Sequence, residues 1–346
     1  MKKIRILSLD GGGIRGILPG TILTYLEEQI RKESKNEKAT IGEYFDLIAG
    51  TSTGGILSLI YLCPNDDGTY KFTAKEAVDL YLDQGDDIFD VSFKKKLKSL
   101  GGIADEKYDA DALEDALKTY LEDTKLSQAL KPCLITSYDI RNRKAHFFSS
   151  ADAATNRIYD YYLRDVARAT SAAPTYFEPV RIKSIFGTPH SLIDGGVFAN
   201  NPALCAYAEA RTIEFSKVLN NSEKPDKPKA ENMLIVSIGT GSVEKSYHYK
   251  EFKDASLLKW LNPLIDIMMS GNSETVDYQL KQIYETLPKE YSEDYYRIQP
   301  KINLADSEMD NAELSNLTAL HEDGLAAVVQ YKDQLDAIAK KLVKNH

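Results

Sequence analysis

Apolar residues along this chain fall into short runs that alternate with longer segments of helical spacing. The short runs predict strands, and the helical segments Ile17 to Ile30 and Gly55 to Leu62 lie between them. The predicted strands cover residues 4–9, 47–49, 132–137, 191–193 and 233–238. Such alternation is typical of an α/β fold with a largely parallel central sheet. We therefore predict a three-layer αβα architecture.

Further helical spacing occurs outside this alternation. Segments 73–84 and 109–122 predict an α-helical insertion, and segments 257–268 and 328–342 predict a helical C-terminal region. Their apolar stripes are typical of core-facing helices, with a lid or the face of a homo-oligomer as the alternative near the C-terminus. No clear linker interrupts the chain. We predict a single domain over residues 1–346, with its motifs within about 4–240 and a helical extension over about 250–346.

Composition and charge narrow the class of protein. The chain has 346 residues, 43% of them hydrophobic, and a formal net charge of −9, which argues against nucleic acid as a general partner. Cys63, Cys133 and Cys205 are odd in number and widely spaced, which argues against a disulfide framework and a zinc site. No stretch approaches the ~20 apolar residues of a membrane-spanning helix, and the N-terminus lacks a secretory signal. We expect a cytoplasmic protein whose contact with membranes is peripheral.

Ser52 stands at the centre of Gly50-Thr51-Ser52-Thr53-Gly54, between a predicted strand and a predicted helix. A G-x-S-x-G turn presents a nucleophilic serine, because the two glycines remove side chains that would collide in the sharp turn. So short a pattern is not specific by itself. Its interpretation depends on the neighbouring motifs.

A second glycine-rich turn follows the first predicted strand. The stretch Asp10-Gly11-Gly12-Gly13-Ile14-Arg15-Gly16 leaves backbone N–H groups uncovered, which suits a phosphate or the oxyanion of acyl transfer. It also matches the G-x-G-x-x-G of dinucleotide-binding turns. Such a site needs an acidic residue about 20 positions later at a strand end, where this chain has the charged segment 31–38. A nucleotide-binding protein remains the alternative to an acyl hydrolase.

A nucleophilic serine needs a proton acceptor, most often a histidine. The five histidines stand at the terminus, in polar surroundings, or on predicted strand edges. Asp194 stands at the end of the run Ser191-Leu192-Ile193 and precedes Gly195 and Gly196, where sheet-edge active sites are built. Asp194 is therefore the candidate base, with a simple turn as its alternative role.

Together these motifs resemble the patatin-like phospholipase family. The match covers the glycine loop, the elbow through Gly55 and the Asp194-Gly195-Gly196 element in the family's order, and extends to segments 169–177 and 198–202. Agreement at five separated places is far more specific than any one motif. The resemblance spans roughly residues 4–240 and is weak in the C-terminal third.

This resemblance implies a patatin-like fold and a Ser-Asp dyad without histidine, with Ser52 as nucleophile and Asp194 as proton acceptor. It implies hydrolysis of fatty-acyl esters of phospholipids through an acyl-enzyme, as in a phospholipase A or lysophospholipase, with no metal or cofactor. The remaining implied residues are the oxyanion-hole loop Gly11, Gly12, Gly13 and Arg15 and the supporting glycines Gly50, Gly54, Gly195 and Gly196. An inactive binding module is disfavoured, because both dyad residues are present.

Membrane contact and regulation are less defined. Phe93 with Lys94, Lys95 and Lys96 predicts either an interfacial helix or an ordinary surface helix packed on the core. Bacterial patatin-like enzymes similar to this chain include antiphage effectors activated by a cyclic dinucleotide. The resemblance therefore implies a cyclic-nucleotide activator, to which no residues of this chain are assigned.

Overall fold

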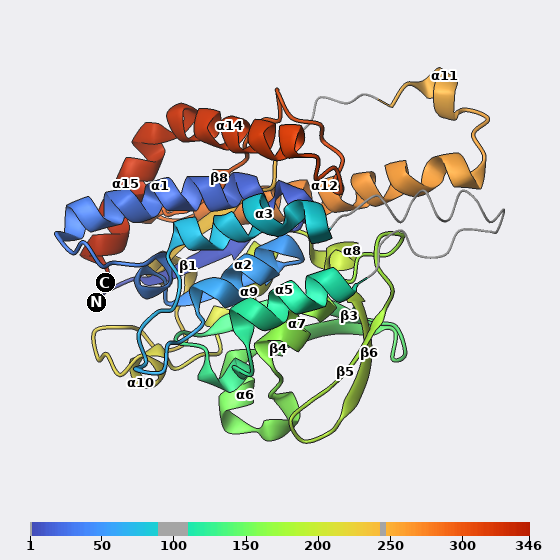
Figure 1. The fold of residues 1–346 in the computed structure, drawn as a ribbon. Coiled ribbons are helices and arrows are strands. Elements are labelled where there is room, and N and C mark those ends of the chain that lie inside the picture. The colour runs from blue at the N-terminus through green and yellow to red at the C-terminus, as the bar shows by residue number, and fades with distance from the viewer. Residues whose placement is uncertain (1, 89–109, 243–246) are drawn as a thin grey trace.

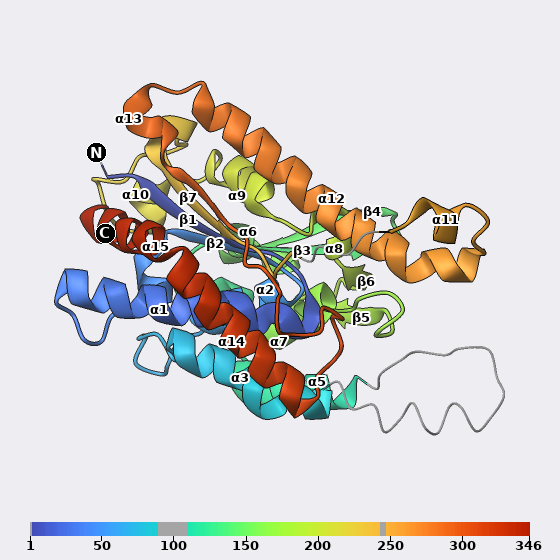
Figure 2. The same cartoon turned by 90° about the horizontal axis from the view of Figure 1, so that it is seen from above.

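The computed structural model describes residues 2–88, 110–242 and 247–346. These residues form an eight-stranded sheet with helices packed on both of its faces (Figures 1 and 2). The strand order is β5-β6-β3-β2-β1-β7-β8, and β4 pairs with β3 off this path. The predicted three-layer α/β architecture is confirmed. The predicted basic patch at Phe93 to Lys96 lies outside the described residues.

The central strands are parallel and the edge beyond β3 is antiparallel. Parallel pairs join β1 to β2 and β7, β2 to β3, and β7 to β8, whereas β3–β4, β3–β6 and β5–β6 are antiparallel. Every residue of β1, β2 and β7 is buried, as expected for parallel strands covered on both faces. The strands are β1 Ile4–Leu9, β2 Leu47–Thr51, β3 Cys133–Asp139, β4 Lys144–Ser149, β5 Val180–Lys183, β6 Pro189–Asp194, β7 Met233–Ile238 and β8 Tyr295–Ile298.

The register of β3 brings two distant strand ends together. Thr51, the last residue of β2, pairs with Thr136, and Asp194, the last residue of β6, pairs with the next residue, Ser137. The ends of β6 and β2 therefore lie on either side of β3, one residue apart in its register. Whatever follows Thr51 must lie close to Asp194.

The helices divide between two hydrophobic cores, one on each face of the sheet. Helices α1, α2, α3, α5, α7, α14 and α15 cover one face, and α9 and α12 cover the other (Figure 2). The longer helices are α1 Ile17–Ser34, α2 Thr53–Tyr61, α3 Ala74–Ile88, α5 Asp111–Leu121, α7 Leu163–Thr170, α9 Ala203–Ala210, α12 Leu257–Glu285, α14 Leu314–Gln330 and α15 Lys332–Lys344. The shorter ones are α6 Ser150–Thr155, α8 Gly196–Ala199, α10 Phe215–Val218, α11 Tyr249–Phe252 and α13 Lys289–Ser292.

The C-terminal third does more than add helices. Between α13 and α14 the chain forms β8, which pairs in parallel with β7 and extends the sheet. Helix α12 then covers the second face, and α14 packs on α1 on the first (Figure 2). No helix among the described residues is long and apolar enough to cross a membrane.

Candidate active site

Ser52 lies in a tight turn between β2 and α2. Its φ of 55° is in the left-handed region, and its backbone N–H donates to Thr170 Oγ1 at 2.8 Å. A Cβ on Gly50 would lie 2.3 Å from Gly54 O, and a Cβ on Gly54 would lie 2.3 Å from Leu9 O. Only glycine fits at these two positions, so the backbone can turn sharply enough to place Ser52 above the sheet.

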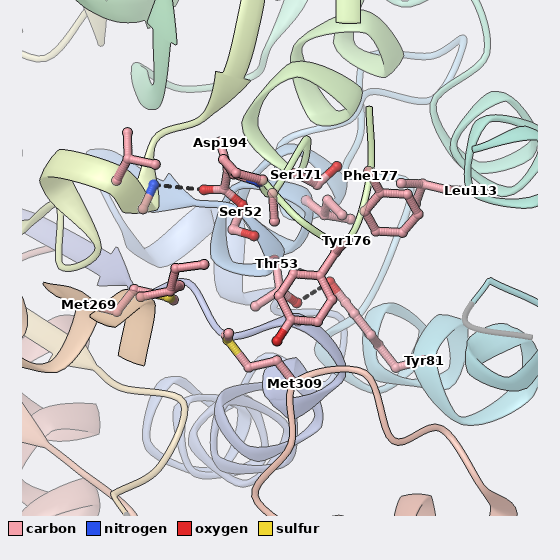
Figure 3. Close-up of a pocket in the computed structure, with 18 of the residues that line it drawn as sticks. Ser52, Thr53, Tyr81, Leu113, Ser171, Tyr176, Phe177, Asp194, Met269 and Met309 are labelled. Carbon is pink, nitrogen blue, oxygen red and sulfur yellow. Dashed lines mark hydrogen bonds between the residues drawn. The ribbon is translucent and has the colours of Figure 1, made fainter. Parts of the chain in front are cut away.

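Asp194 lies next to Ser52, as the register of β3 requires (Figure 3). Its Oδ1 accepts a hydrogen bond from the N–H of Gly196 at 2.7 Å, and the side chain is almost fully buried. Burial raises the pKa of Asp194 to about 6, against hydrogen bonds from the Ser52 side chain and the Gly196 backbone that lower it. A carboxylate with a raised pKa is a stronger base than a free aspartate, and this one lies beside the side chain of Ser52 (Figure 3).

The glycine loop offers two unoccupied N–H groups beside Ser52. The N–H of Gly11 donates to Asn200 O at 3.1 Å, and that of Ile14 donates to Met309 O at 2.9 Å. The N–H groups of Gly12 and Gly13 donate to none of the described residues, and both glycines line the cavity that contains Ser52. Paired backbone donors beside a nucleophile are the usual components of an oxyanion hole.

Arg15 lies near this loop but its side chain faces elsewhere. Its Nε donates to Gly12 O at 3.3 Å, so the guanidinium braces the loop. Arg15 lines a polar cavity next to the one that contains Ser52. Its side chain can therefore support the Gly12–Gly13 peptide, while the backbone supplies the donors.

An apolar cavity of about 150 Å³ leads away from Ser52. Helices α2, α3 and α5 form one side of it, and the 171–177 segment and α12 form the rest (Figure 3). Thr53 Oγ1 donates to Tyr81 OH at 2.6 Å and fixes α3 against the elbow. The lining includes Ile56, Leu80, Leu113, Leu117, Phe177, Ile265, Met268 and Met309. Such a wall suits a fatty-acyl chain.

Several residues of this site carry no obvious sequence signal. Thr170 holds the amide of Ser52 and donates to Thr136 O at 2.6 Å, so it ties the elbow to β3. It lies in the 169–177 segment, whose match to the family was the available signal. Asp10 and Arg297 form a bidentate ion pair directly before the glycine loop, with distances of 2.9 and 2.6 Å. Arg297 lies on β8, in the part of the chain where the resemblance was weak.

The histidines that were set aside as bases lie away from Ser52. His190 on β6 contacts Asp139 on β3 at 3.1 Å, and the ring of His146 on β4 lies 4.7 Å from that of His190. No histidine of the described chain lines the apolar cavity. No group of three or more His, Cys, Asp or Glu side chains among the described residues is arranged to hold a metal ion.

Comparison with known proteins places this geometry in a family. Residues 7–207 match the family model described as Patatin-like phospholipase. Patatin-like protein 2 of Arabidopsis thaliana is 38% identical, with 93% of this chain and 82% of that protein covered. Patatin group D-2 of Solanum tuberosum is 32% identical over 93% of this chain and 82% of that protein. The similar protein named Probable inactive patatin-3-Kuras 1, also of S. tuberosum, is 32% identical over 93% and 85%. The chain belongs to the patatin-like phospholipase family, a family of lipid acyl hydrolases.

Proposed function

We propose that this protein hydrolyses fatty-acyl esters of phospholipids with Ser52 as nucleophile and Asp194 as general base. The observation that carries the proposal is the position of the buried Asp194 carboxylate beside Ser52 in one apolar cavity (Figure 3), next to two backbone N–H groups that donate to none of the described residues. Each component of serine acyl transfer is thus represented by a described residue.

The reaction follows from these positions. Asp194 accepts the proton of the Ser52 hydroxyl as Oγ attacks the ester carbonyl carbon, and the N–H groups of Gly12 and Gly13 donate to the resulting oxyanion. When the tetrahedral intermediate collapses, the ester C–O bond breaks and the leaving alcohol takes the proton from Asp194. Water then attacks the acyl-enzyme, gives its proton to Asp194, and releases the fatty acid and free Ser52.

Two substitutions test this proposal. Ser52→Ala and Asp194→Asn should each lower release of fatty acid from phospholipid, and of nitrophenol from its esters, by at least a thousandfold, because each removes a reacting group. A fluorophosphonate should label wild type at Ser52 and leave Ser52→Ala unlabelled. Circular dichroism should show an unchanged fold. Full hydrolysis by either variant would refute the dyad.

The nucleotide-binding alternative has less support, because protein neighbours account for the glycines of the loop. A Cβ on Gly12 would lie 2.2 Å from Thr240 Oγ1, and a Cβ on Gly13 would lie 2.2 Å from Met309 O. Saturable binding of a dinucleotide, lost on enlarging Gly13, would favour that alternative.

Activation by a cyclic dinucleotide remains a prediction from the resemblance alone. If it operates, addition of the right cyclic dinucleotide should raise fatty-acid release from vesicles well above the basal rate. The measurement is vesicle hydrolysis with and without a panel of cyclic dinucleotides, with Ser52→Ala as the blank. A full basal rate that none of them alters would count against an activator.

A further inference from the structure

A polar cavity of about 470 Å³ adjoins the apolar cavity. The two share Tyr176, Met269 and Met309 as lining residues, so they adjoin at these side chains. The polar cavity is otherwise lined by the start of the glycine loop, by α12 and by β8. None of the steps of acyl transfer described above uses it.

Arg15 is the buried cation of this cavity. The residue is only 8% exposed, and its Nε donates to Gly12 O. Among the described residues no carboxylate forms a close ion pair with its guanidinium, and Asp266 and Glu308 act on it only through longer-range electrostatics. Arg297 in the same cavity differs, because both of its terminal nitrogens donate to Asp10. A buried charge without a close counter-ion is costly, and a guanidinium favours a phosphate or carboxylate. Arg15 therefore marks a place for an anionic group of a ligand.

Helix α12 contributes acidic side chains to the same cavity. Asp266, Ser270, Ser273 and Glu274 follow the spacing of one side of α12, and all four line the cavity. Asp266 accepts a hydrogen bond from Tyr247 OH at 2.9 Å, and neither Asp266 nor Glu274 forms a close ion pair with a cation among the described residues. Asp277, one turn further, is already paired with Lys281 at 2.7 Å. Asp266 and Glu274 thus line the cavity that Arg15 lines, and Glu308 lines it as well.

A cavity lined by a buried cation and by the carboxylates of α12 is complementary to a ligand that carries both charges. We propose that the polar cavity binds the zwitterionic head group of a phospholipid, with the phosphate on Arg15 and the ammonium group between Asp266 and Glu274. An anionic head group without an ammonium would meet the acidic side unpaired and bind more weakly. This assignment rests on the proposed function, because it places the acyl chain of the same lipid in the apolar cavity.

The test compares phosphatidylcholine with phosphatidylglycerol of identical acyl chains, each diluted in neutral detergent micelles. Every rate is divided by the same variant's rate on a nitrophenyl ester, so that changes at the serine itself cancel. Wild type should favour phosphatidylcholine about tenfold, the effect of one charge-assisted contact. Arg15→Gln should lower the normalised phosphatidylcholine rate by tenfold or more. Asp266→Lys combined with Glu274→Lys should reverse the preference.

Glu285→Lys is the matched control, because Glu285 ends the same helix and lines neither cavity. It should keep the wild-type ratio. The head-group assignment would be overturned if wild type and the double lysine variant had the same ratio of phosphatidylcholine to phosphatidylglycerol hydrolysis. It would also be overturned if Arg15→Gln kept the wild-type normalised rate on phosphatidylcholine. Failure of wild type to hydrolyse any ester would instead refute the proposed function.

A binding measurement separates the head group from free phosphate. Calorimetry should detect binding of glycerophosphocholine to Ser52→Ala, and this binding should be lost in a variant that also carries Asp266→Lys and Glu274→Lys. Inorganic phosphate should bind Ser52→Ala more weakly than glycerophosphocholine does. Inorganic phosphate that binds as tightly, and is unaffected by the lysines, would indicate a simple phosphate site and overturn the lipid assignment.

Discussion

The pKa of Asp194 sets the pH range in which the proposed dyad would operate. Its burial raises its pKa to about 6, and only the ionised carboxylate can accept the serine proton. We therefore expect kcat/KM on a soluble ester to be low at pH 5, to rise with pH, and to be half-maximal near pH 6.

The raised pKa also affects stability, because the carboxyl of Asp194 binds its proton more tightly in the folded than in the unfolded chain. Asp194 therefore lowers the free energy of unfolding as pH rises from about 4 to 6.

Substitution of the two histidines near β3 provides a control for assigning this pH profile to Asp194. Burial lowers the pKa of His146 to about 4, and neither His146 nor His190 lines the cavity with Ser52. His146→Gln and His190→Gln should therefore leave the midpoint of the profile unchanged. A midpoint near 4, or one that moves in either glutamine variant, would contradict the assignment to Asp194.

The sequence could single out Ser52 and Asp194 as candidates because their turns need glycine at fixed offsets, and such requirements leave a readable motif. The role of Thr170 and the direction in which the Arg15 side chain points could not be predicted from the sequence. Thr170 reaches the Ser52 amide only because α7 packs beside β3, and Arg15 faces the polar cavity because of α12 and β8. Contacts between distant elements have no fixed spacing along the chain, so no local pattern records them.

Strand β8 connects the C-terminal third to the glycine loop. From β8, Arg297 holds both carboxylate oxygens of Asp10, and Ser273 of α12 donates to Asp10 Oδ2 at 3.1 Å. Asp10 precedes Gly11, which is followed by the proposed oxyanion donors Gly12 and Gly13. Arg297→Lys keeps the charge but loses the two-pronged contact. We expect it to lower kcat and the rate of fluorophosphonate labelling about tenfold, with little change in KM.

Arg181→Lys offers a comparison, because Arg181 is exposed on the edge strand β5 far along the sheet order from β8. That variant should behave as wild type. If Arg297→Lys folds stably and labels at the wild-type rate, Arg297 does not position the loop.

The existence of β8 also shows what the hydrophobic pattern could not predict. Helices α12 and α15 contain most of the apolar stripes at 257–268 and 328–342 that predicted helices, although the second stripe crosses the break between α14 and α15 at Tyr331. Strand β8, in contrast, has four residues, and three of them, Tyr295, Tyr296 and Arg297, are only partly buried. A short edge strand without strict alternation is not distinguishable from a loop by periodicity. It forms because the chain returns from α13 along the free edge of β7, where residues 295–298 pair with β7.

Both ends of the chain meet in one buried ionic cluster. Asp46, just before β2, accepts hydrogen bonds from Arg5 of β1 and from Lys224 of the loop at 220–231. Arg5 also donates to Leu342 O, and Lys224 to Asn345 O, so α15 is held against the start of the sheet. The loop at 220–231 is thereby anchored, with Lys224 only 3% exposed.

Removal of the central carboxylate should therefore weaken the fold as a unit. Asp46→Asn leaves two buried cations facing each other and should lower the free energy of unfolding by about 3–5 kcal/mol, measured by urea denaturation at pH 7. Asp46→Asn combined with Lys224→Met should recover part of this loss, because one unpaired charge is gone.

The stabilisation by Asp46 should also depend on pH. Arg5 and Lys224 lower the pKa of Asp46, so its contribution to the free energy of unfolding is present above pH 4 and is lost as pH falls through the lowered pKa. The curves of wild type and Asp46→Asn should then converge in acid. Equal urea midpoints at pH 7 would instead mean that packing alone joins the two ends.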